Sequence, residues 1–263
     1  DRIITIKIDL ENKQFLEPAN FFFEVRRQIT EKNPKFKFPI FDTTFTYYWL
    51  KAFPHIPLKE KTKELAAVEL LTEIADAISP LSVFSAIKKV IEIGIGQLQK
   101  IKSKRAFNAQ PFLRRLTQLN EIKEIEEVLP QALSLDLAMN LDKNKRRLFV
   151  FVDTFEQLWG ALKEHVSERA DIQDKWIREI IKHTLIECQY QICWFLFGRE
   201  RIRWEEIDKD LTEYLEQHLV GQLSPEDCKI FLTEAGIKEE QIQKRIIEES
   251  KGLPFYLDRA VDL

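Results

Sequence analysis

The sequence predicts a helix-rich α/β protein in which a three-layer core with a parallel sheet carries a large helical insertion and a small helical subdomain. Two continuous apolar runs, residues 148–153 (LFVFVD) and 191–198 (QICWFLFG), flank a helical pattern, which is typical of a strand–helix–strand unit. Only 7 of the 263 residues are glycine, which favours long helices over the tight turns of an all-β protein.

The amino-terminal region is predicted to begin with a strand. Residues 2–10 (RIITIKIDL) alternate and are rich in β-branched side chains, so we expect a strand that ends near Asp9. Residues 20–31 have the pattern of a helix with Asn20 as its N-cap. The aromatic segment 43–53 predicts a second helix.

A helical insertion is expected over residues 59–142. Apolar residues repeat there at helical spacing, first over 65–78 and again over 81–91. Gly94 is expected to weaken the second of these helices, and two short helices follow around Pro130.

The pattern changes after the insertion. The run 148–153 shows no alternation, which predicts a central strand that is covered on both faces. A helix with one apolar face over 176–185 leads to the second run, and residues 218–223 are a candidate for a further short strand.

The carboxyl-terminal segment predicts a small group of helices. Ser224 and Pro225 form a helix start, Gly236 and Gly252 each end a helix, and Pro254 begins the last one. We therefore divide the chain into a first part of the core, the helical insertion, a second part of the core and a partial lid subdomain: residues 1–58, 59–142, 143–203 and 204–263.

The composition limits the possible partners. There are 40 basic and 43 acidic side chains, so no overall field attracts the chain to nucleic acid or to an anionic membrane. We interpret the basic residues within 100–115 as a solvated helix face, because acidic residues follow at once, and we do not expect a nucleic-acid partner. No apolar run is long enough to cross a membrane, no signal peptide is visible, and the three cysteines are sparse. These features predict a cytoplasmic protein without a membrane partner.

Two strand ends carry the candidate catalytic residues. Asp153 ends the first apolar run, and a carboxylate at this point of a parallel strand projects into the crevice where α/β proteins bind ligands. An Asp there can orient Mg²⁺ and a nearby Glu, here Glu156, can polarise a water, although a strand-end Asp is also a common helix N-cap. Arg199 follows the second run and is expected at the same edge, where it can pair with a γ-phosphate or lie in a charged surface loop.

A third segment, residues 250–261 (SKGLPFYLDRAV), joins two helices through a Gly-x-Pro turn, which by itself needs no ligand. Taken in order, strand-Asp-x-x-Glu, strand-Gly-Arg and Gly-Leu-Pro-Phe-Tyr-Leu resemble the STAND branch of the P-loop NTPases, which is related to the AAA+ proteins and includes NACHT and apoptotic ATPases. Residues 6–12 (IKIDLEN) and 39–58 (PIFDTTFTYYWLKAFPHIPL) also resemble segments of bacterial members.

The resemblance implies a role for each matching residue. Asp153 would be the Walker B carboxylate at the metal, Glu156 would position water, and Arg199 would be the sensor arginine. Gly252 and Pro254 would form the lid motif near the adenine. The cofactors would be ATP or ADP with Mg²⁺. Exchange of ADP for ATP would release the lid, permit self-association and activate an effector domain elsewhere in the same longer chain.

One motif of the family is missing. No G-x-x-x-x-G-K-[ST] occurs in the 263 residues, so we expect the P-loop before Asp1 and ATP hydrolysis only if that segment is present. The alternative is a catalytically inert pseudo-ATPase scaffold for protein–protein interaction. A weaker option is an origin-recognition-like ATPase that contacts DNA through residues 100–115.

Overall fold

The structure is a computed structural model that describes most of the chain in two compact units. The described residues are 2–55, 83–159, 173–219 and 221–261. The apolar stripe predicted over 65–78 lies outside them. The units are residues 1–213 and 214–263, and each is described by itself.

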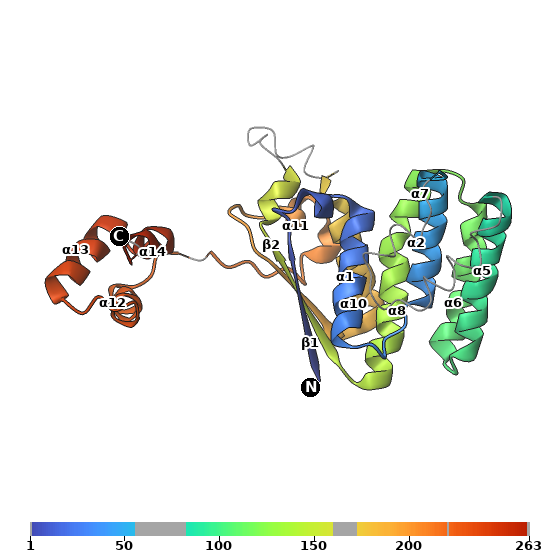
Figure 1. The fold of residues 1–263 in the computed structure, drawn as a ribbon, viewed down its shortest axis with the longest axis horizontal. Coiled ribbons are helices and arrows are strands. Elements are labelled where there is room, and N and C mark those ends of the chain that lie inside the picture. Colours follow the sequence, from blue (N-terminus) through green and yellow to red (C-terminus); the bar gives the residue numbers. More distant parts are fainter. Residues whose placement is uncertain (1, 56–82, 160–172, 220, 262–263) are drawn as a thin grey trace. The chain divides into compact units, whose positions relative to one another are not determined.

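A three-stranded parallel sheet organises the first unit (Figure 1). Its strands are β1 (Ile3–Asp9), β2 (Arg147–Asp153) and β3 (Ile192–Leu196), in the order β1-β2-β3. The three strands predicted for this part of the chain are confirmed, and the protein is a helix-rich α/β fold with a small parallel sheet.

Helices make up most of the first unit. They are α1 (Pro18–Lys32), α2 (Pro39–Ala52), α5 (Val83–Lys100), α6 (Lys104–Arg115), α7 (Ile122–Glu127), α8 (Leu129–Asn144), α10 (Lys175–Cys188) and α11 (Trp204–Ile207). Short 3-10 turns are η1 (Lys13–Leu16), η2 (Leu116–Gln118), η3 (Phe155–Trp159), η4 (Gln189–Gln191) and η5 (Lys209–Leu211). Figure 1 shows α1, α8 and α10 along one side of the sheet, with α2, α5 and α6 beyond α8.

The sheet buries one face against these helices and leaves the other open within the described residues. The buried face consists of alternate apolar residues, Ile4, Ile6, Ile8, Leu148, Val150 and Val152. On the open face Phe151 stacks on Phe195 and Phe197, with ring centroids 4.7 and 6.0 Å away, and the latter two rings are exposed. Within the described residues, the expectation that both faces of 148–153 are covered is therefore wrong. The aromatic residues of the open face pack on one another instead of against a covering helix.

Prolines set two helix starts that the sequence prediction placed later. α1 begins at Pro18, with Glu17 as its N-cap, so the prediction of Asn20 as N-cap is wrong and that residue lies inside the helix. α2 begins at Pro39 rather than at residue 43. Proline suits the first turn because the N–H that it lacks would have no helical partner there.

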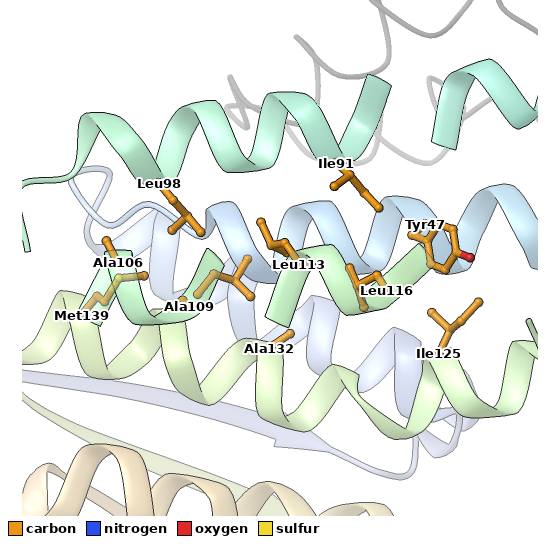
Figure 2. Packing of buried hydrophobic residues seen from close by; sticks show 11 residues of the cluster. Tyr47, Ile91, Leu98, Ala106, Ala109, Leu113, Leu116, Ile125, Ala132 and Met139 are labelled. Carbon is orange, nitrogen blue, oxygen red and sulfur yellow. The ribbon is translucent and has the colours of Figure 1, made fainter. Parts of the chain in front are cut away.

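A second apolar core lies among the helices beyond the sheet (Figure 2). Side chains of α2, α5, α6 and α8 meet in it, including Ile91, Leu98, Leu113 and Met139. α5 continues through Gly94, where a Cβ would collide with the side chain of Thr43 in α2. The glycine therefore allows the two helices to approach closely.

One ion pair is buried between α1 and α2. Arg26 donates through Nε and Nη2 to the two carboxylate oxygens of Asp42, at 2.9 and 2.8 Å. Asp136 of α8 is fully buried nearby; its Oδ2 accepts a hydrogen bond from the N–H of Phe41 at 2.7 Å, and its Oδ1 has no partner within the described residues. Burial, and to a smaller extent the charge of Asp42, raise the pKa of Asp136 well above its usual value.

Three short helices form the second unit: α12 (Pro225–Glu234), α13 (Glu240–Ser250) and α14 (Pro254–Val261). Their core contains Cys228, Leu232 and Leu257. Ser224 caps α12 as predicted, since its Oγ accepts the N–H of Asp227 at 3.1 Å. The strand predicted over 218–223 is wrong, because the described residues of that range form none.

Candidate functional site at the carboxyl edge of the sheet

The three strands end at a common edge. β1 and β2 pair in parallel, with Asp9 opposite Asp153 in the last step of the register. The N–H of Phe197 donates to the carbonyl of Val152 at 2.8 Å, and the N–H of Phe155 donates to the carbonyl of Phe197 at 2.9 Å, so the chain just beyond β3 stays beside the end of β2 and the start of η3. The carboxyl ends of the strands therefore bring acidic and basic side chains to one edge.

Asp153 is paired on both of its oxygens. Oδ1 accepts the N–H of Thr154 at 2.9 Å, and Oδ2 lies 2.8 Å from Lys7 Nζ. The hydrogen bond and the charge of Asp153 raise the pKa of Lys7, because both favour the ammonium form. The side chains of Lys7 and Asp153 are 64% and 40% exposed, so a cation or an anion from solution can compete for either member.

Thr154 has an unusual backbone conformation. Its φ is +58°, which a β-branched residue rarely adopts. Its hydroxyl donates to Asp9 Oδ1 at 2.7 Å, and this hydrogen bond lowers the pKa of Asp9 because it favours the carboxylate. Backbone strain of this kind is concentrated at functional sites, so it supports a functional role for this edge.

Glu156 and Arg199 form a second pair at the edge. Arg199 Nε lies 3.2 Å from Glu156 Oε1, and the backbone N–H of Arg199 donates to Oε2 at 3.4 Å. A Cβ at Gly198 would lie 3.3 Å from Oε2, so the glycine gives the carboxylate room. Glu156 is 17% exposed and Arg199 is 85% exposed, which allows the guanidinium to turn to an anionic ligand.

The structure brings the predicted residues Asp153, Glu156 and Arg199 to one edge, and their catalytic roles stay predictions. Sequence reasoning missed three neighbours, Asp9, Thr154 and Lys7. A signal for the first was present, since residues 2–10 run into Asp9 as the second strand runs into Asp153.

The two predicted lid residues lie in the second unit. Gly252 has φ +71°, and its carbonyl accepts the N–H of Leu223 at 2.8 Å. A Cβ on Gly252 would lie 2.5 Å from the carbonyl oxygen of Leu223, so local packing already requires glycine there. Pro254 is the first residue of α14.

The side chains at the sheet edge have the chemistry that Mg²⁺ and phosphate require. Proteins commonly hold Mg²⁺ with one or two carboxylates, waters and substrate phosphates, and Asp9 and Asp153 are such carboxylates. Lys7 and Arg199 are cations that can pair with phosphate. Among the described residues no group of three or more His, Cys, Asp or Glu side chains is arranged for a metal ion. A cation at this edge would therefore need further oxygen ligands from phosphate and water.

Comparison of the chain with protein-family models, with curated proteins and with solved structures found no match. In the described ranges, no helix combines the length and the apolar character needed to cross a bilayer.

Proposed function

We propose that residues 1–263 belong to a nucleotide-gated, signal-transduction switch module of the STAND type. They would contribute the Walker B and sensor half of the core, the helical insertion and part of the lid. The observation that carries the proposal is the position of Asp153 at the end of β2 and of the Glu156–Arg199 pair in the segments that follow β2 and β3, at the edge of a parallel sheet where α/β proteins bind ligands.

Each residue has a defined task in this proposal. Asp153 would hold Mg²⁺ in place of Lys7, Glu156 would position the attacking water, and Arg199 would pair with the γ-phosphate. ATP with Mg²⁺ supplies the transferable phosphoryl group. Gly252 and Pro254 shape the lid beside the adenine. Nucleotide exchange then controls self-association and an effector domain of the same polypeptide. The switch would act in the cytoplasm, and it would need no nucleic-acid partner.

The proposal requires a P-loop from residues outside this sequence, because the 263 residues contain no such motif to hold the β- and γ-phosphates. The P-loop strand of the family is normally central in its sheet, whereas β2 pairs directly with β3 here. The segment would therefore have to add its strand beyond β3, which is an edge strand of the described sheet and adjoins an open face. Parallel sheets are normally covered on both faces, so a further strand and its helix would complete this one. The module is an ATPase only in a polypeptide that has this segment.

The test uses the natural polypeptide that contains these residues. Denaturation should release ADP or ATP, and Asp153→Asn should lower Mg²⁺-dependent ATP hydrolysis on the order of 10²-fold, as loss of one preorganised charge contact does in other enzymes. Asp210→Asn, which changes an exposed carboxylate in η5, is the matched control and should leave turnover unchanged. Equal turnover in Asp153→Asn and the unaltered protein would exclude the metal role.

A second function, the pseudo-ATPase scaffold, is favoured by the open aromatic face. Exposed apolar patches of this kind mark protein-binding surfaces. Phe195 and Phe197 are 36% and 47% exposed there, beside Phe151. Absence of released nucleotide, together with partner binding that is indifferent to ATP, would favour the scaffold over the switch.

A further inference from the structure

Asp174, the residue before α10, has a buried carboxylate that has no part in the function proposed above. Asp174 is 1% exposed. Oδ2 accepts the indole N–H of Trp204 at 2.8 Å and that of Trp159 at 3.4 Å, while Oδ1 accepts Nε of Arg178 at 3.1 Å. One carboxylate thus connects three segments of the first unit.

The two tryptophans belong to the segments that carry the ion pair at the sheet edge. Trp159 is the last residue of η3, which contains Glu156. Trp204 is the first residue of α11 and follows Arg199 closely in sequence. The ring of Phe155 packs edge-on against both indoles, with centroids 5.4 and 5.8 Å away, so the two segments also share an apolar contact.

The geometry points to Asp174 as a positioning residue that fixes η3 and the segment before α11 against each other, so that Glu156 and Arg199 meet. The importance of this for catalysis rests on the proposed function, but the positioning itself does not. The Arg199 side chain is 85% exposed, so solvent screens its attraction to Glu156 and the pair contributes little of its own. Its geometry must therefore come from the backbone that carries it.

The surroundings of Asp174 suit a fixed anchor. Arg178, which is 5% exposed, compensates its charge and also lies 3.8 Å from Asp208. Burial raises the pKa of Asp174, although the hydrogen bonds from Trp204 and Arg178 oppose the rise. A buried carboxylate without these donors would be strongly unfavourable, so the indoles and the guanidinium hold one another in place through it.

The test follows the backbone amide of Arg199 by NMR in this chain without nucleotide. Because that N–H donates to Glu156, Glu156→Gln should shift its resonance in the unaltered protein. The same substitution should lose this effect in the Asp174→Asn background, because an amide has one acceptor oxygen in place of two and cannot accept the indole N–H groups and Arg178 Nε together. It should keep the effect in Asp208→Asn, a matched control that removes another carboxylate near Arg178, because the Asp208 carboxylate pairs with Arg178 and Lys182.

A persistent Glu156→Gln shift in folded Asp174→Asn would overturn the inference, as would the absence of any such shift in the unaltered protein. If Asp174→Asn does not fold, Trp204→Phe decides the question, because it removes one donor and keeps an aromatic ring against Phe155. The readout needs no ATP, so failure of the positioning and failure of the nucleotide proposal are distinguishable. If the natural polypeptide hydrolyses ATP, Asp174→Asn should lower kcat more than it weakens nucleotide binding.

Discussion

Two arginine–carboxylate pairs in the first unit differ mainly in burial, and the difference separates architecture from reactivity. Arg26 and Asp42 meet through two hydrogen bonds, with side chains only 4% and 0% exposed. Arg199 and Glu156 meet at 3.2 Å, with the arginine 85% exposed. No ligand can reach the first pair, whereas the second can exchange one partner for a ligand.

The two pairs are also held by different forces. Removing two charges from water is unfavourable, so each member of the buried pair depends on the other for compensation. The exposed pair is screened by water and ions and contributes about 0–1 kcal/mol. The buried pair therefore stabilises the junction of α1 and α2, while the exposed pair depends on its surrounding segments for its geometry.

The sharpest test of this contrast is Arg26→Ala. It leaves Asp42 buried without its cation, and we expect the free energy of unfolding to fall by about 3–5 kcal/mol. Urea denaturation followed by circular dichroism measures the change. The double variant Arg26→Met with Asp42→Leu should recover much of the loss, because it removes both charges, and failure to recover it would contradict the charge explanation.

A second test uses Asp136, whose Oδ1 lacks a partner in the described core. Its folded-state pKa lies well above 3.8, so the folded state binds more protons than the unfolded state between the two pKa values. The contribution of Asp136 to stability is therefore complete below pH 3.8 and is lost as the pH rises through its folded-state pKa, by up to about 1.4 kcal/mol per pH unit.

Asp136→Asn should remove this slope, because the amide does not titrate. Relative to the unaltered protein, the variant should gain stability as the pH rises from 4 toward neutrality. Denaturation curves at several pH values measure the difference. Parallel pH profiles for the two proteins would show that Asp136 is ionised in the fold and that the inference from its burial is wrong.

The smallest effect is expected at the exposed pair. Arg199→Ala should change the free energy of unfolding by less than about 0.5 kcal/mol, because the side chain is mostly solvated. The same urea measurement as for Arg26→Ala allows a direct comparison. A loss as large as that of Arg26→Ala would remove the distinction between the two pairs.

The strands and the start of α12 could be predicted from the sequence, because their signals are local. The apolar runs that become β2 and β3 are continuous, and Ser224 is followed by the proline and acidic residues of a helix start. Open and buried faces could not be separated in β2, because aromatic residues on the open face pack on those of the next strand and hide the alternation.

The site was only partly accessible to sequence reasoning. Asp153 and Arg199 follow apolar runs and could be found, whereas the neighbourhood of Asp9 and Asp153 depends on a pairing register between distant segments. The place of Thr154 in the site could not be predicted, because it depends on a positive φ that a β-branched residue disfavours. The role of Asp174 could not be predicted either, because it depends on the indoles of Trp159 and Trp204, which come together only in the folded chain.

The pairing of β1 with β2 has a consequence during synthesis. Ile3 pairs with Arg147, so the ribosome must add roughly 140 residues, which takes about 7–30 s at 5–20 residues per second, before β1 has its neighbour. Until then Ile4, Ile6 and Ile8 lack the strand beside which they are buried in the finished sheet. During this interval α1, which packs on β1, is already synthesised and available to cover this segment until the emerging β2 completes the edge that carries Asp9 and Asp153.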